Sequence, residues 1–321
     1  MSGPWQSRFT FDDILGDSAA LRHVIVLARR AAEGGYPTLL VGESGTGKEL
    51  LAHAIHNASV CREGPFVAIN CGALSGELAV AELCGYEPGS FTGADRRTHT
   101  GFLDAARHGT LFLDELQDMA PRPQSVLLRF LETGDFVRVG GTQPVQARTR
   151  VLAALNVGVD EVERRGLVRS DLLYRLNCLT IDIPPLRERR EDIRPIAEKS
   201  LREELHFLGE VDESLWTVLA ACPYPWPGNA RGLRNVLLKA ILASSSERLT
   251  ADDLPTFLWQ EPSASTPTAA TIGDGEGRAA RVAEDVRALQ AVLRASDHNV
   301  SEAARRLGVH RSTIYRKLGR R

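Results

Sequence analysis

Apolar residues in the first half of the chain follow two different patterns. Short, largely apolar runs occur at 38–41, 66–70, 110–115, 151–156 and 179–183. Between these runs, apolar residues recur at three- and four-residue spacing, as they do from Leu21 to Ala31. The runs predict strands that are covered on both faces, and the spaced pattern predicts helices. Their alternation predicts an α/β protein, a parallel sheet with helices on both faces.

The second half of the chain shows only the helical pattern. It is present at 193–208, 213–221 and 231–243, which predicts a small all-helical module. Residues 260–279 are rich in Pro, Ser, Thr, Ala and Gly and predict a flexible linker. We therefore expect four parts: an α/β part at 1–187, a helical part at 188–259, the linker at 260–279 and a helical tip at 280–321.

Composition excludes several classes of protein. Hydrophobic residues make up 43% and charged residues 25% of the 321 residues, as in soluble globular proteins with two or three domains. We find no apolar run long enough to span a bilayer and no secretory signal at the N-terminus. The odd number and wide spacing of the cysteines predict reduced thiols in a cytoplasmic protein. They are Cys61, Cys71, Cys84, Cys178 and Cys222.

Charge is distributed unevenly along the chain. The net charge is −2, yet the last 21 residues, from Ser301, hold seven Lys or Arg and one Glu. The tip therefore carries +6 and the rest of the chain −8. A basic tip on an acidic body favours a nucleic-acid contact at one end of the molecule, although a solvated basic tail would have the same composition.

The segment between the first predicted strand and the next helix is typical of a phosphate-binding loop. It runs Gly42, Glu43, Ser44, Gly45, Thr46, Gly47, Lys48, Glu49. Glycines let backbone N–H groups turn toward phosphates, the following helix directs its positive end at them, and Lys48 would reach the β- and γ-phosphates. The general motif ends in Ser or Thr, which binds Mg²⁺, whereas Glu49 stands here. The alternative is an ordinary glycine-rich turn.

Two carboxylates at the end of a buried strand predict the second half of a nucleotide site. Asp114 would hold Mg²⁺, and Glu115 would act as general base toward water. Alone, the pair could simply cap a turn, but together with the loop it predicts ATP hydrolysis. Asn156 ends the next strand and could orient water near the γ-phosphate, or only close the strand into a turn.

Three arginines are candidates for contacting phosphate. Arg169 and Arg175 could neutralise charge on a transferring phosphoryl group, or form surface ion pairs as most arginines do. Arg231 lies in the first turn of a predicted helix, where a cation opposes the helix dipole. Either a phosphate or a local ion pair would explain its presence there.

The C-terminal tip has the pattern of a helix-turn-helix. Ser301 can cap a short helix that ends at Gly308, and a basic second helix starts near His310 or Ser312. The residues expected to face DNA are Arg311, Ser312, Thr313, Tyr315, Arg316 and Lys317. A helical hairpin for protein contact is the alternative, and the basic charge favours DNA.

Together these motifs resemble the bacterial enhancer-binding activators of sigma-54 RNA polymerase, which are AAA+ ATPases with a helical lid and a Fis-type helix-turn-helix. The most specific element is similar to the family's GAFTGA loop, which contacts the sigma factor. It consists of Gly89, Ser90, Phe91, Thr92, Gly93 and Ala94. Its glycine-hinged aromatic and hydroxyl side chains have no obvious place in a core. The phosphate loop with Glu49 is also the family's version.

The resemblance implies roles for further residues. Asn70 resembles the residue that restrains the catalytic Glu115, and Asn156 resembles sensor I. Arg169 and Arg175 resemble arginine fingers that reach a neighbouring subunit's ATP, and Arg231 resembles sensor II. Four positions depart from the family pattern: Ser90, Leu155, Val168 and Gly232. Gly232 could loosen the lid, because glycine in a helix costs about 1 kcal/mol relative to alanine.

The resemblance also implies a function. We expect a cytoplasmic activator that uses ATP and Mg²⁺ to remodel the sigma-54 holoenzyme while it is bound to enhancer DNA. We expect a homo-oligomer, a hexameric ring when active and a dimer at rest, with no membrane contact. A regulatory partner protein or a longer parent chain would supply the signal. The Phe91–Thr92 loop argues against a repressor, and the Fis-like tip argues against a general unfoldase.

Overall fold

The computed structural model describes residues 5–74, 78–90, 98–244 and 247–259. The expected linker and helix-turn-helix lie outside the described residues. No helix within the described ranges is both long and apolar enough to cross a bilayer.

A five-stranded parallel sheet forms the centre of the α/β part. Its strands follow the order β2-β5-β8-β1-β9, and all neighbouring pairs are parallel. Their bounds are β1 Thr38–Val41, β2 Phe66–Asn70, β5 Thr110–Asp114, β8 Arg150–Leu155 and β9 Leu179–Asp182. The five predicted strands are confirmed to within one residue at each end.

Both faces of this sheet are buried, which explains the apolar runs. Along β5, Leu111 and Leu113 join one hydrophobic core, whereas Phe112 joins the other. Helices α1 (Ala19–Gly34) and α2 (Lys48–Asn57) cover the Phe112 face. The opposite face is covered by α3 (Ala79–Cys84), α4 (Phe102–Ala105), α5 (Pro121–Thr133), α6 (Val159–Arg165) and α7 (Ser170–Leu176).

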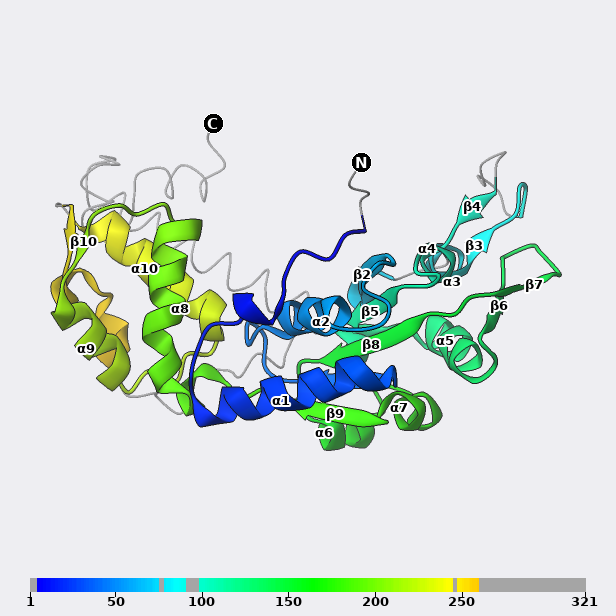
Figure 1. Ribbon diagram of the computed structural model, residues 1–321, viewed down its shortest axis with the longest axis horizontal. Coiled ribbons are helices and arrows are strands. Elements are labelled where there is room, and N and C mark those ends of the chain that lie inside the picture. The colour runs from blue at the N-terminus through cyan, green and yellow to red at the C-terminus, as the bar shows by residue number, and fades with distance from the viewer. Residues whose placement is uncertain (1–4, 75–77, 91–97, 245–246, 260–321) are drawn as a thin grey trace, which may run out of the picture. The chain divides into compact units, whose positions relative to one another are not determined.

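Two small antiparallel hairpins were not predicted. One pairs β3 (Gly85–Tyr86) with β4 (His99–Thr100), and the other pairs β6 (Asp135–Val137) with β7 (Pro144–Gln146). They lie at the same end of the α/β part (Figure 1), and a bridge between Tyr86 and Val139 joins them. Strands of two or three residues are too short to show a period-two pattern in the sequence.

The lid has a separate hydrophobic core around Trp226. Its helices are α8 (Ile193–Lys199), α9 (Glu213–Ala221) and α10 (Asn229–Ala243). The expectation of an all-helical module needs one correction, because β10 (Glu210–Val211) and β11 (Arg248–Leu249) form a short parallel pair. The helix predicted at 193–208 is also shorter, since α8 passes into a π turn that ends at Glu204.

Candidate nucleotide site

The carboxyl ends of four neighbouring strands hold a continuous row of polar side chains. Asn70 is the last residue of β2, Glu115 follows β5, Asn156 follows β8, and Lys48 follows the loop after β1. Glu115 accepts hydrogen bonds from both amides, from Asn70 Nδ2 at Oε2 (2.8 Å) and from Asn156 Nδ2 at Oε1 (2.8 Å). Lys48 Nζ donates to Asn156 Oδ1 at 2.5 Å. The row therefore follows the spatial order of the strands.

The loop after β1 has the conformation that its glycines allow. Gly45 and Gly47 have φ values of 78° and 104°, in the left-handed region that favours glycine. Helix α2 begins at Lys48 without a side-chain cap, so amides of its first turn remain available to an anion. Lys48 is 6% exposed, and its Nζ donates to the carbonyls of Gly42 (2.6 Å) and Glu43 (3.0 Å).

Burial shifts the pKa values of Lys48 and Asp114 in opposite directions. It lowers the pKa of Lys48, although the nearby carboxylates of Asp114 and Glu115 oppose the shift. It raises the pKa of Asp114, and Lys48 opposes that shift. Both groups are thus partly desolvated charges, which a bound anion and cation would stabilise.

Glu115 has a strained backbone. Its φ and ψ are 54° and 48°, a left-handed conformation that is uncommon for residues other than glycine. Strand β5 consequently ends at Asp114, one residue earlier than predicted. Such strain is typical of functional sites, and here it accompanies a carboxylate held between two amides.

The residues at this edge fit a magnesium ion that is bound together with phosphates. Mg²⁺ usually takes one or two carboxylates, with phosphate oxygens and water completing its coordination shell. Asp114 supplies a partly buried carboxylate whose pKa is raised by that burial. Glu49 is exposed in the first turn of α2, and the Thr46 hydroxyl already donates to Glu43 O at 2.8 Å. Among the described residues, no group of three or more His, Cys, Asp or Glu could hold a metal alone.

The lid contacts the loop through the start of α10. Arg231 Nη1 donates to Ser44 Oγ at 3.1 Å, and the backbone N–H of Ala230 donates to Gly45 O at 3.1 Å. The two segments approach so closely that only glycine fits at position 45, because a Cβ there would lie 2.3 Å from Gly228 O. These contacts give Arg231 a reason to occupy a first-turn position that disfavours cations.

Asn229 does not cap α10 as its position suggests. The N-cap is Gly228, and Asn229 is the first helical residue, fully buried and at a φ of 48°. Its side chain instead accepts from Leu186 N (2.7 Å) and donates to Ser44 O (3.0 Å). Partners far away in the sequence therefore use both ends of this amide, and none of it remains for the helix start.

Arg169 and Arg175 lie at the two ends of α7 and are exposed. Arg169 forms a two-pronged ion pair with Asp171, at 3.0 Å and 2.7 Å, and Arg175 Nη2 lies 3.4 Å from Leu131 O. Within the described part of the chain, neither arginine forms a hydrogen bond or ion pair with the residues around Lys48. Both guanidinium groups are therefore accessible to a second molecule.

The base of the predicted sigma-factor loop packs against the second hairpin. Gly89 and Ser90 are described, whereas Phe91–Ala94 lie outside the described residues. A Cβ at Gly140 would lie 2.5 Å from Ser90 Cβ, and Gly140 has a φ of 77°. Glycine is thus required there for the turn to approach the loop.

A charged cluster, which the sequence does not predict, joins the same two segments to α4. Arg138, after β6, donates to Asp104 Oδ2 at 2.8 Å and to Glu87 Oε1 at 3.3 Å. Asp104 also pairs with Arg107 at 2.9 Å. These residues come from three segments, so no local spacing could indicate the cluster.

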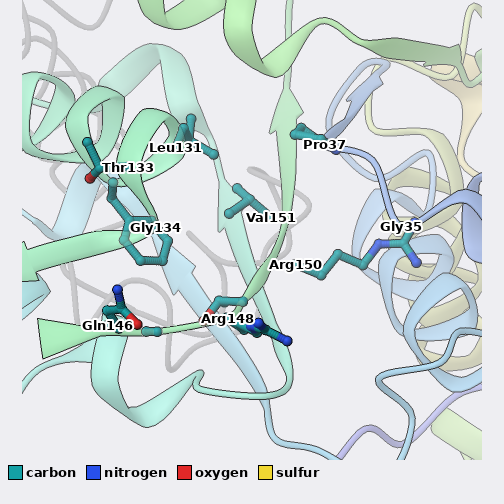
Figure 2. A pocket seen from close by; sticks show the side chains of 12 residues that line it. Gly35, Pro37, Leu131, Thr133, Gly134, Gln146, Arg148, Arg150 and Val151 are labelled. Carbon is teal, nitrogen blue, oxygen red and sulfur yellow. The ribbon is translucent and has the colours of Figure 1, made fainter.

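A cavity of about 410 Å³ lies at the opposite, amino-terminal edge of the sheet. Figure 2 shows Arg150 extending from β8 toward Gly35, just beyond α1. Its guanidinium donates to the carbonyls of Ala31 and Ala32, at the end of α1. This arginine therefore satisfies a helix C-terminus, and the cavity is separate from the row of site residues.

Three family matches cover most of the chain. Residues 14–182 match the sigma-54 interaction domain, and residues 187–271 match the AAA+ ATPase lid domain. Residues 285–320 match the bacterial regulatory proteins of the Fis family.

Curated relatives match across nearly the whole chain. The transcriptional regulatory protein ZraR of Klebsiella oxytoca is 38% identical over 96% of this chain and 68% of its own length. The DNA-binding transcriptional regulator NtrC of Klebsiella pneumoniae is 36% identical, over 95% of this chain and 69% of its own. The chain spans about half (51%) of a third relative, the activator AcoR of Bacillus subtilis, at 36% identity.

Solved structures of NtrX from Brucella abortus share the fold. One has a TM-score of 0.68 and covers 95% of this chain and 68% of its own, at 32% identity. A second, in complex with ATP, has a TM-score of 0.67 and covers 96% of this chain and 69% of its own, also at 32% identity.

Proposed function

The chain belongs to the family of sigma-54-dependent activators, AAA+ ATPases with a Fis-type DNA-binding domain, and we propose that it uses ATP hydrolysis to remodel the sigma-54 RNA polymerase holoenzyme and open promoters. The observation that supports this most is the position of Glu115, a carboxylate held between two amides beside the lysine of a phosphate loop.

Each residue of the row has a part in this proposal. The loop amides and Lys48 bind the β- and γ-phosphates, and Asp114 holds Mg²⁺, which would neutralise charge developing on the phosphate oxygens. Glu115 takes the proton from the attacking water. Because a carboxylate with both oxygens bonded to amides is a poor proton acceptor, Asn70 and Asn156 must first release it. Arg231 binds the phosphates of the nucleotide from the lid.

The exposed arginines support an active site shared between subunits. Arg169 and Arg175 would reach the γ-phosphate bound by a neighbouring copy, where they neutralise transition-state charge. A head-to-tail arrangement completes the site of every subunit when it closes into a ring, and we propose a hexameric ring that forms from dimers at rest.

The remaining partners are proposed from the family. The Phe91–Thr92 loop contacts sigma-54, and its base transmits movement through the contact between Ser90 and Gly140. The helix-turn-helix binds enhancer DNA in the cytoplasm with the six side chains from Arg311 to Lys317 named above, which raises the local concentration of activator at the promoter. A partner protein or an upstream segment supplies the signal.

Two variants test the proposal in vitro, with sigma-54 holoenzyme, enhancer-promoter DNA and ATP. Glu115→Gln should bind ATP without hydrolysing it, and Thr92→Ala should hydrolyse ATP without forming open complexes. Asp118→Asn changes an exposed carboxylate three residues from Glu115 and should leave both activities intact. Normal turnover by Glu115→Gln, or open complexes formed by Thr92→Ala, would contradict the assigned roles.

A further inference from the structure

Glu43, the second residue of the phosphate loop, is bound by two segments that come from beyond the sheet. Arg187 holds its carboxylate from two sides, with Nη1 at 2.9 Å from Oε2 and Nη2 at 2.7 Å from Oε1. Asn229 Nδ2 donates to Oε2 at 3.2 Å. Arg187 belongs to the turn that leads from β9 into the lid, and Asn229 is the first residue of α10. One carboxylate therefore joins the phosphate loop, the lid and the turn at residues 186–189 between them, called the hinge below.

The loop carbonyls next to Glu43 are held by the same lid and hinge segments. Asn229 donates to Ser44 O at 3.0 Å, and Arg189 Nη2 donates to Thr46 O at 2.9 Å. Arg189 is only 3% exposed, so it is held in one position by its surroundings. The loop thus cannot shift without disturbing the hinge, and the hinge cannot rotate without pulling on the loop.

The backbone of Glu43 leads directly to the phosphate-binding lysine. Its carbonyl oxygen accepts from Lys48 Nζ at 3.0 Å and from Thr46 Oγ1 at 2.8 Å. An acidic side chain in a phosphate loop would repel the nucleotide unless a cation neutralised it, and Arg187 supplies that cation. The hydrogen bond from Arg187 also lowers the pKa of Glu43, so the pair is fully ionised near neutral pH.

We propose that Glu43 is a positioning residue for ATP binding, which couples the orientation of the lid to the phosphate loop through Arg187 and Asn229. The inference rests on the ATPase function proposed above. A simple surface ion pair is the alternative, because the two side chains are 38% and 39% exposed and such pairs stabilise proteins little. A positioning role predicts that loss of Glu43 weakens ATP binding, whereas a simple surface ion pair predicts unchanged affinity for ATP.

The test is a double-mutant cycle on the full chain, with Glu43→Gln, Arg187→Gln and both together. Each single change should raise the KM for ATP about fivefold and alter kcat less than about twofold, because it removes binding shared by ground and transition states. The KM of the double variant should be no higher than the larger of the two single-variant KM values, since both changes break the same contact. Arg187→Lys keeps the charge but loses the fork, and should lie between wild type and Arg187→Gln.

A matched control is Arg194→Gln. Arg194 is half-exposed and pairs with Glu213 and Glu198 inside the lid, away from the loop, so its loss should leave KM unchanged. An unchanged KM in Glu43→Gln, or effects on KM that multiply in the double variant, would overturn the proposed coupling. So would a shift in melting temperature without a shift in KM. A wild-type chain that hydrolyses no ATP would instead contradict the proposed function.

Discussion

Acid should destabilise the α/β part through two histidines of the phosphate-loop helix, α2. His53 is 6% exposed, and its Nδ1 accepts the backbone N–H of Arg8 at 3.3 Å, so this nitrogen carries no proton. His56 is fully buried, and its Nδ1 lies 2.8 Å from Thr110 Oγ1 on β5, the strand that delivers Asp114. Burial lowers the pKa of each histidine to about 4.

The sign and size of the effect follow from linkage. A histidine has a pKa of about 6.5 in the unfolded chain, so the folded state favours the neutral ring. The stabilisation is complete above pH 6.5 and is lost as pH falls toward 4. By pH 5 the loss amounts to about 2 kcal/mol for each histidine, or about 4 kcal/mol for the pair, a large share of a typical free energy of unfolding.

The assay is urea unfolding followed by circular dichroism at pH 7.5 and pH 5.0. Wild type is compared with the double variant His53→Gln/His56→Gln, because glutamine can accept and donate hydrogen bonds but does not titrate. Contributions from the carboxylates are common to both proteins and cancel in the comparison. The double variant should lose about 4 kcal/mol less than wild type between the two pH values.

His23, on the exposed side of α1, provides the control. His23→Gln should behave as wild type at both pH values. If the double variant loses as much stability as wild type between pH 7.5 and pH 5.0, the histidines do not carry the acid sensitivity and the reasoning from burial is refuted.

Three further changes have defined outcomes. Gly232→Ala should stabilise the protein by about 0.5–1 kcal/mol in urea unfolding, because its new Cβ meets no atom within 4 Å; a loss of stability would contradict this. Gly45→Ala should weaken ATP binding more than about tenfold by calorimetry, since its φ of 78° disfavours alanine and its Cβ would clash with Gly228 O; unchanged affinity would show that the loop yields easily. Arg175→Ala mixed with Lys48→Ala should regain ATPase activity if subunits share sites, and no rescue at any ratio would argue against a shared site.

The sheet could be predicted from the sequence because its signal is local. Each strand is buried on both faces, so burial appears as a run of neighbouring apolar residues such as Leu111 to Leu113. The phosphate loop and the acidic pair after β5 are local in the same sense, since their chemistry depends on residues next to one another. The missed hairpins and the β10–β11 pair are too short for such a signal and depend on distant contacts.

Only the tertiary structure reveals how the site residues are connected. The amides of Asn70 and Asn156 meet at Glu115 because β2 and β8 flank β5 in the sheet, an order that the chain does not display. Asn229 lies 186 residues from Glu43, yet it binds that carboxylate in place of capping its own helix. Spacing along a chain determines which groups a strand or helix presents together, whereas packing of separate segments determines which of these groups meet.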